Sequence, residues 1–387
     1  MRKAPSMWLM LVMLMFPQIV ETIYSPALGN LADTFAVSDT QAAQTLSVYF
    51  LAFALGVVVW GIAADKWGRR PTMLVGLALY AAAAAVAMCT DSFTVIMLAR
   101  AASAFGIAVG SVVTQTMLRD TYSGESLAKV FSLMGMGIAI SPVVGLFLGG
   151  QLVDAGGYTF VFATLLFMAA GLWLCNATLL PETQTEKQPV QLMSLGKRML
   201  NDPHIWRSAG LVALYNIALF SYYQLGPFVF ASMGLDAEQF GYSGVVLGVS
   251  TLVGSYLNRW LLSRQIAIQT ILGGASVLLL VGAIGVFATE GMRLFNTVPL
   301  MLLPMMLVVI AFGLAIPNVL SRALTAYAKQ AGSAGAILGL MYYLMIGVGL
   351  MLAGNLQDLG VSLIFCGITA FMVTLSRSKA GAPVTTS

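Results

Sequence analysis

The chain has 387 residues, of which 59% are hydrophobic and only 9% charged, and its formal net charge is +4. A typical soluble domain carries about 25% charged residues, so this composition excludes an ordinary soluble protein and indicates a polytopic membrane protein. The three cysteines lie within apolar segments, and the single histidine, His204, lies in a polar stretch. The sequence therefore predicts no disulfide framework, no metal site and no histidine-based catalysis.

Twelve apolar segments follow one another along the chain, each long enough to cross a bilayer as a tilted helix. They are expected near residues 7–28, 42–64, 72–88, 93–118, 130–153, 159–180, 208–231, 243–262, 267–289, 298–321, 332–354 and 361–376. The short alternating segments of a membrane β-barrel are absent from the sequence. The basic start and first apolar run resemble a signal peptide, but no small-residue cleavage site follows, so a retained first helix is expected. The sequence predicts an all-α integral membrane protein.

Lysine and arginine gather at the N-terminus and in every second connection between these segments. They are Arg2, Lys3, Lys66, Arg69, Arg70, Arg119, Lys129, Lys187, Lys197, Arg198, Arg207, Arg259, Arg264, Arg322, Lys329, Arg377 and Lys379. The alternate connections contain Arg293 and otherwise acidic residues. Cytoplasmic connections carry the excess of positive charge, so both termini are expected in the cytoplasm.

A weak internal repeat divides the chain into halves. The pattern Gly61-x-x-x-Asp65-Lys66-Trp67 recurs as Gly254-x-x-x-Asn258-Arg259-Trp260, at the same end of the second helix of each half. We expect a six-helix bundle over residues 1–180, a flexible cytoplasmic linker over 181–207, a second bundle over 208–376 and a cytoplasmic tail over 377–387. Two six-helix halves related by an axis along the membrane normal form the major facilitator architecture.

Several motifs carry a family resemblance. GIAADKWGRRP at 61–71 resembles the signature loop of the major facilitator superfamily, and ARAASAFG at 99–106 resembles its fourth-helix arginine motif. SPVVGLFLGG at 141–150 resembles the fifth-helix motif of twelve-helix drug–proton antiporters. ETIYSPAL at 21–28 and RDTY at 119–122 are similar to the multidrug resistance protein D group. The resemblance implies a twelve-helix secondary transporter of a bacterial inner membrane, not an enzyme, that exports drugs in exchange for protons.

The sequence departs from these motifs at three positions. Ser103 and Ala104 stand where the fourth-helix motif usually has Gln and Gly, and Leu146 replaces the proline of a Gly-Pro pair. Pro142 lies four residues before Leu146 and is expected to bend the fifth helix, which should be straighter than the family pattern implies. Small residues let helices approach closely in lipid, so Pro142, Gly145 and Gly149 are predicted to form either a packing hinge or a simple close contact.

The second connection is a candidate gate at the cytoplasmic end. Its cations and Asp65 share a tight turn at Gly68, and Asp65 can pair with Arg69 or Arg119 or face the start of the eleventh helix near Gly332. The alternative is a simple positive-inside anchor. The predicted gating residues are Gly61, Asp65, Gly68, Arg69, Arg70, Arg119 and Asp120.

Glu21 and Arg100 are the charged residues that fall well inside apolar segments, among 15 acids and 19 cations. Helix rise places Glu21 about 21 Å along the first helix and Arg100 about 10 Å along the oppositely directed fourth helix, at nearly the same depth. A carboxylate in hydrocarbon is neutral, paired or in a wet cavity. Two readings stay open: a static salt bridge, or a proton-carrying Glu21 whose proton affinity Arg100 tunes.

The substrate class follows from aromatic and polar residues near these charges. Aromatic faces with one acid suit flat, lipophilic and often cationic compounds, although each ring can also pack in lipid. The predicted substrate-binding residues are Gln18, Tyr24, Tyr49, Phe53, Tyr215 and Tyr222. The alternative function is an uncoupled facilitator or importer for a specific metabolite. We expect protons as coupling ion, no other cofactor, no nucleic acid, and a monomer whose partners are small molecules and the bilayer.

Overall fold

The computed structural model describes residues 5–184, 192–291 and 298–376, and every regular element within them is a helix. The predicted all-α fold is confirmed, and each of the twelve predicted segments coincides with a helix. Arg2, Lys3, Lys187, Arg293 and the predicted tail 377–387 lie outside the described residues.

The first half contains α1 to α6. Their bounds are α1 (Met7–Ile23), α2 (Ala27–Phe35), α3 (Asp39–Trp67), α4 (Arg69–Cys89), α5 (Phe93–Thr121) and α6 (Gly124–Leu179). Pro26 separates α1 from α2, which form a pair bent by 53°. Ser38 and Gln41 form a reciprocal capping box that starts α3, satisfying two backbone donors.

α6 contains two of the predicted membrane segments, separated by a short break in the helical backbone. The backbone leaves the helical region at Gly156 and Gly157, and Gly157 has a φ of 67°. A Cβ at Gly157 would lie 2.7 Å from the side-chain oxygen of Asn30, which also accepts the backbone N–H of Tyr158 at 2.8 Å. Glycine therefore permits both the left-handed turn and the close approach of α2.

The second half contains α7 to α13. Their bounds are α7 (Leu192–Leu200), α8 (Pro203–Ser232), α9 (Ala237–Ser263), α10 (Ile268–Gly291), α11 (Val298–Ala323), the 3-10 helix η1 (Thr325–Gln330), α12 (Ala331–Leu356) and α13 (Leu359–Leu375). The side chains of Asp202, Asp236 and Asp358 accept backbone N–H groups at the starts of α8, α9 and α13. Among the described helices, eight are long and apolar enough to span a membrane, or nine with α1 and α2 as one bent span.

Part of the stretch 181–207, for which a flexible linker is predicted, is helical in the structure. α7 forms within it, and α8 begins at Pro203 rather than at 208. Leu195 and Met199, four residues apart, are buried in a cluster with Leu338 of α12, so packing on α12 stabilises a helix that is too short to be stable alone. Residues 185–191 lie outside the described part of the chain.

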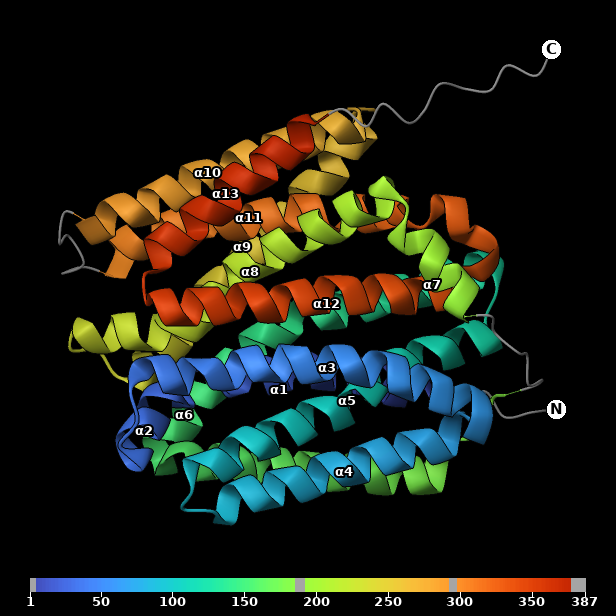
Figure 1. Ribbon diagram of the computed structural model, residues 1–387, viewed down its shortest axis with the longest axis horizontal. Coiled ribbons are helices and arrows are strands. Elements are labelled where there is room, and N and C mark those ends of the chain that lie inside the picture. Colours follow the sequence, from blue (N-terminus) through green and yellow to red (C-terminus); the bar gives the residue numbers. More distant parts are fainter. Residues whose placement is uncertain (1–4, 185–191, 292–297, 377–387) are drawn as a thin grey trace.

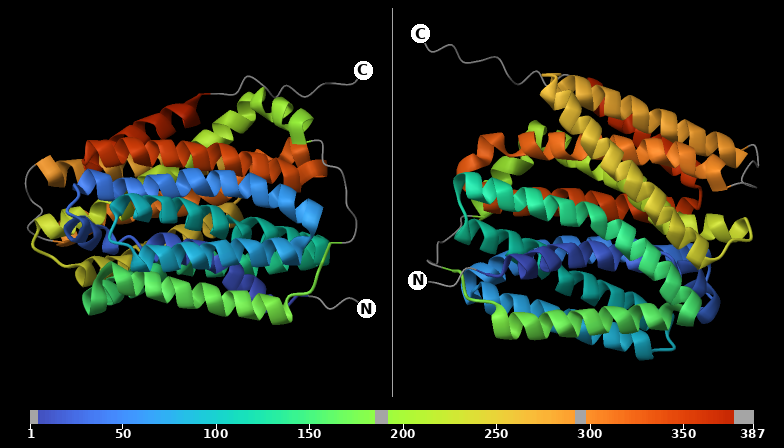
Figure 2. Two further views of the ribbon diagram at one scale, coloured as in Figure 1. Left: turned by 60° about the horizontal axis from the view of Figure 1, so that its bottom comes forward. Right: turned by 180° about the vertical axis from the view of Figure 1, so that it is seen from behind.

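The two halves lie side by side, with the first half in blue to green and the second in yellow-green to red (Figure 1). We call the end of the bundle where α1 begins and α13 ends the terminal face, and the opposite end the far face. α3 and α12 run along each other where the halves meet (Figure 1). Seen from behind, α6 and α9 form a second seam between the halves (Figure 2).

Both seams depend on close backbone approach. A Cβ added at Gly150 of α6 would lie 2.7 Å from the carbonyl oxygen of Ala237 in α9, and one at Gly347 of α12 would lie 2.6 Å from the Leu51 side chain of α3. Such contacts replace the hydrophobic driving force that lipid does not supply.

Hydrogen bonds between the halves lie near the far face. Gln224 of α8 donates to the carbonyl of Ala43 at 2.8 Å and to the hydroxyl of Ser47 at 3.1 Å. The other pairs are Gln44 with Met351 and Asn355, Gln151 with Glu238 and Tyr242, and Ser25 with Tyr223. Within the described residues, no hydrogen bond joins the halves at the terminal face, so the polar closure of this structure is at the far face.

Candidate functional site

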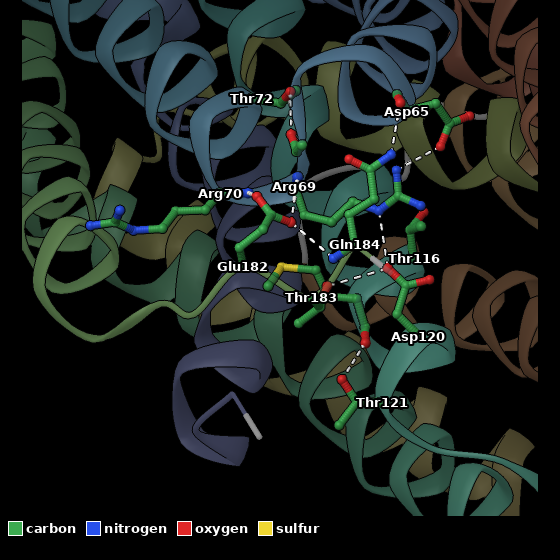
Figure 3. A network of polar contacts seen from close by, with 12 residues as sticks. Asp65, Arg69, Arg70, Thr72, Thr116, Asp120, Thr121, Glu182, Thr183 and Gln184 are labelled. Atoms are coloured by element: carbon green, nitrogen blue, oxygen red, sulfur yellow. Dashed lines mark hydrogen bonds and ion pairs between the residues drawn. The ribbon is translucent and has the colours of Figure 1, made fainter. Parts of the chain in front are cut away.

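The terminal face contains a charged network in the first half (Figure 3). Arg69, at the start of α4, contacts Asp65 of α3 at 2.6 Å and Asp120 of α5 at 3.0 Å. The Arg69 side chain is only 9% exposed, so both ion pairs are partly shielded from water. Three helices of the first half are therefore joined by one guanidinium group.

Glu182, just after α6, completes this network at the backbone of α4. Its carboxylate accepts the N–H groups of Arg69 at 3.0 Å and Arg70 at 3.1 Å, which are free donors at a helix start. Gly68 has a φ of 107°, and a Cβ there would lie 2.6 Å from Glu182 Oε2. The side chain of Arg70 turns away and donates to the carbonyl of Ala177 at 2.5 Å.

Thr183 and Gln184, which follow Glu182, also contact the charged network around Arg69. The hydroxyl of Thr183 donates to Asp120 at 3.2 Å, and the amide of Gln184 donates to the backbone carbonyl of Asp65 at 2.7 Å (Figure 3). Glu182, Thr183 and Gln184 were not among the residues predicted from the sequence. The available signal was an acid beside Pro181, directly after an apolar helix and on the same membrane side as the basic loop.

Two alternatives raised for Asp65 are decided by these contacts. Asp65 pairs with Arg69, whereas Arg119 has no acidic partner within ion-pair distance among the described residues and lies 5.6 Å from the ring centre of Phe131. No described residue of α12 joins the network, so the predicted contact near Gly332 is not made in this structure. A Cβ added at Gly61 would lie 3.7 Å from the Val112 side chain of α5, which is an ordinary contact distance.

Glu21 and Arg100 meet inside the first half, as their depths predict. Both are buried, with 1% and 0% of their surface exposed. The Arg100 guanidinium carbon lies 3.8 Å from the ring centre of Tyr24, three residues after Glu21, and 4.5 Å from that of Tyr49 on α3. The hydroxyl of Tyr24 donates to Thr45 at 2.9 Å, which fixes that ring. Arg100 is thus held between two aromatic faces.

Glu21 and Arg100 do not form the static salt bridge that was one alternative. The two charges interact electrostatically, but no carboxylate of the described chain lies within 4.0 Å of the guanidinium. Oε1 of Glu21 and all three side-chain nitrogens of Arg100 are buried without a hydrogen-bond partner. The sequence could place both groups at one depth, but the direction of each side chain depends on packing that only the structure shows.

Four of the unpartnered polar atoms belong to this pair. Eleven buried side-chain atoms of the described residues lack a hydrogen-bond partner, and Oε1 of Glu21 and the three side-chain nitrogens of Arg100 are among them. The others on α3, α5 and α8 belong to Tyr49, Thr114, Tyr215, Ser221 and Gln224. Buried polar groups are normally paired, so the four unpartnered atoms of Glu21 and Arg100 indicate a place that water or a polar ligand occupies.

Five aromatic residues form a cluster that crosses the seam between the halves. Tyr49 stacks with Phe53 at 6.1 Å, and Phe53 contacts Tyr343 of α12 at 4.8 Å, across the seam between the halves. Phe50 of α3 similarly contacts Phe220 of α8 at 4.6 Å. We call Tyr49, Phe50, Phe53, Phe220 and Tyr343 the aromatic cluster. Phe50 and Tyr343 were missed, because no sequence pattern shows which helices of opposite halves face each other.

Three other predicted binding residues have different surroundings. Tyr222 packs on Phe240 and donates to Ser243 at 2.7 Å, so it belongs to the interior of the second half. Tyr215 is buried with an unpartnered hydroxyl. Gln18 is half-buried, and its backbone carbonyl accepts the hydroxyl of Thr22 at 2.8 Å.

The predicted packing hinge contacts α1. A Cβ at Gly145 would overlap the Thr22 side chain, and one at Gly149 would overlap the backbone of Ile23. Pro142 lies inside α6, whose backbone leaves the helical region at Gly156 and Gly157 rather than at the proline. Leu146 fills the space beside Gly244 of α9. These contacts show close packing, and hinge motion stays a prediction.

Two packed six-helix halves, with a buried acidic and a buried basic residue in the interior of the first half, form the architecture of a membrane transporter. The family model for the Major Facilitator Superfamily matches residues 10–353. The chain belongs to the major facilitator superfamily and is a transporter, not an enzyme.

Known relatives agree with this assignment. An uncharacterized transporter of Rickettsia bellii (strain RML369-C) is 30% identical over 370 residues, covering 92% of this chain and 91% of the relative. Multidrug resistance protein D of Escherichia coli (strain K12) is 27% identical over 360 residues, covering 92% and 90%. The crystal structure of a D-xylose-proton symporter superposes with a TM-score of 0.75 at 15% identity, covering 95% of each chain, which shows the shared fold.

Proposed function

We propose that this transporter exports lipophilic, often cationic drugs across a bacterial inner membrane in exchange for protons. Similarity to multidrug resistance protein D supports the drug class. The observation that carries the proposal is the buried, unpaired Glu21 beside the equally unpaired Arg100. A carboxylate in such a position can hold a proton, and a nearby guanidinium stabilises the negative charge that remains when the proton leaves.

Exchange follows when proton and drug compete for Glu21. A cationic drug approaches the carboxylate and favours loss of its proton, while the aromatic cluster contacts the apolar body of the drug. Reprotonation from the acidic side then removes the attraction and releases the drug. Alternating access requires the far-face hydrogen bonds to break and the terminal face to close.

The terminal face is the cytoplasmic face in this proposal. The charged network of Asp65, Arg69 and Asp120 then serves as the cytoplasmic gating element, with Glu182 attaching the linker to it. Single cysteines at Glu125 on the terminal face and Asp39 on the far face, introduced after Cys89, Cys175 and Cys366 are replaced by serine, test the orientation. In intact cells, a membrane-impermeant thiol reagent should label the cysteine at 39 and leave that at 125 unlabelled; the reverse pattern contradicts the orientation.

Glu21→Gln is the decisive variant. The amide has the shape of a protonated carboxyl but cannot release a proton. In vesicles, wild-type protein should drive export of a fluorescent lipophilic cation that stops when the proton gradient is collapsed, and the variant should lose this transport.

Glu125→Gln is the matched control, because the Glu125 side chain is 83% exposed on the terminal face. It should transport like wild type. Gradient-driven export that persists unchanged in Glu21→Gln would refute the coupling role. Saturable uptake of a polar solute without dependence on the gradient would instead favour a facilitator.

A further inference from the structure

The interior site contains two opposite charges, and neither is neutralised by a direct partner. Glu21 and Arg100 interact electrostatically, yet they form no ion pair, and their buried polar atoms have no hydrogen bonds. An unpaired buried charge is strongly destabilising, so a protein keeps two of them close together only where something else compensates them. A ligand with complementary charges satisfies both at once.

The surroundings of Arg100 favour a carboxylate as the ligand group that binds to it. Tyr24 and Tyr49 cover the guanidinium at 3.8 and 4.5 Å from their ring centres, and ring contacts do not use its in-plane N–H donors. Planar N–H pairs of arginine match the two oxygens of a carboxylate. Tyr24 and Tyr49, which we call the tyrosine cage, therefore orient the Arg100 guanidinium while leaving its N–H edge free for hydrogen bonds.

We propose that the preferred transported molecules are amphoteric aromatic compounds, with a carboxylate bound by Arg100, an ammonium bound by Glu21 and a ring system against the aromatic cluster. The inference rests on the proposed function for the location of the transported molecule. It adds the charge pattern of that molecule. A simple lipophilic cation compensates Glu21 and leaves Arg100 unpaired, whereas a zwitterion compensates both and leaves the buried site neutral.

The aromatic cluster is the binding surface for the ring system of the transported molecule in this proposal. Tyr49 is both part of the tyrosine cage over Arg100 and stacked on Phe53, which in turn contacts Tyr343 of the second half. A ligand that reaches from Arg100 to these rings contacts both halves. Binding of such a ligand therefore acts on the seam that must rearrange during transport.

Four matched probes separate the two charges. They are 2-naphthylalanine, which is a zwitterion; N-acetyl-2-naphthylalanine, an anion; 2-(2-naphthyl)ethylamine, a cation; and 2-(2-naphthyl)ethanol, which is neutral. Calorimetry on the purified full-length protein in detergent measures their affinities without any gradient. The zwitterion should bind about 10- to 100-fold more tightly than the cation, because it adds charged hydrogen bonds to Arg100.

Two variants assign the charges. Arg100→Gln should bring the affinity of the zwitterion down to that of the cation, and Glu21→Gln should bring it down to that of the anion. The neutral probe has no charged group for either residue, so its binding reports whether each variant keeps an intact site, and the affinities of the charged probes are compared relative to it. Arg100→Lys keeps the charge without the planar donor pair and should lose several-fold affinity for the zwitterion.

The proposal is overturned if wild-type protein binds the cation as tightly as the zwitterion, a comparison that needs no variant to fold. It is also overturned if Arg100→Gln keeps the preference for the zwitterion. Because no proton gradient is present, this result is independent of the vesicle test: coupling can fail while the charge preference stands, and the preference can fail while coupling stands.

Discussion

Replacement of Glu182 by alanine tests whether the start of the linker is anchored to the first half. The variant leaves the N–H groups of Arg69 and Arg70 without their 3.0 and 3.1 Å acceptor. Loss of a helix N-cap destabilises by about 1 kcal/mol, and loss of a carboxylate at the positive end of a helix adds about 0.3 to 1 kcal/mol. We therefore expect a total destabilisation of about 1 to 2 kcal/mol, because the side chain is exposed and part of its charge effect is screened.

Glu125→Ala is the control, because it also removes an exposed glutamate from the terminal face. Glu125 pairs only with Lys129, four residues later on α6, and the two side chains are 83% and 76% exposed. Such a pair contributes about 0.3 to 0.5 kcal/mol. Unfolding in detergent mixtures should show the larger loss for Glu182→Ala, and limited proteolysis should cut its linker faster. Equal stability losses and equal cleavage rates in the two variants would refute the anchoring role.

Substitutions at three further positions, with controls, test contacts inside the bundle. Gly149→Ala should destabilise the protein by about 1 to 3 kcal/mol in the same unfolding assay, because its Cβ meets backbone of α1, whereas Gly171→Ala, which has open space, should not. Tyr49→Phe should retain stability, since it keeps the ring over Arg100 and removes an unpartnered hydroxyl, while Tyr49→Leu should lose about 1 to 2 kcal/mol. Gln224→Leu removes two hydrogen bonds of the far-face seam and should increase thiol labelling of a cysteine placed at Ala43, whose backbone carbonyl still accepts in the reference protein; unchanged labelling would show that these bonds do not hold the seam.

The sequence predicts the fold well because the bilayer restricts the solutions. Apolar segments of about 20 residues must be helices, and each of the twelve coincides with one in the structure. The linker is less predictable, because α7 forms by contact with α12 rather than from its own composition. Leu195 and Met199 are ordinary apolar residues in a polar stretch until a partner surface is known.

The interior site was predictable in depth but not in contacts. Counting residues along two antiparallel helices brought Glu21 and Arg100 to one level, and the contact of Arg100 with Tyr24 agrees with that count. The sequence could not show that Arg100 stacks between tyrosines instead of pairing with Glu21. Opposite charges at matching depth suggest an ion pair, but the aromatic faces of α1 and α3 compete for the same guanidinium group.

The two faces of the protein hold different kinds of contact, and this difference bears on the proposed export cycle. At the terminal face, the described ion pairs around Arg69 lie within the first half and can stay intact while the halves move. At the far face, seven hydrogen bonds between residues that the structure describes join the halves and must break when that face opens.

A typical hydrogen bond contributes about 0.5 to 1.5 kcal/mol, so these seven contribute about 4 to 10 kcal/mol together. Moving a two-state equilibrium from 1:99 to 99:1 requires about 5.5 kcal/mol of differential binding. The far-face seam is therefore of a strength that protonation of Glu21 and binding of one charged ligand can reverse. A seam made of many buried ion pairs would hold the transporter in one state.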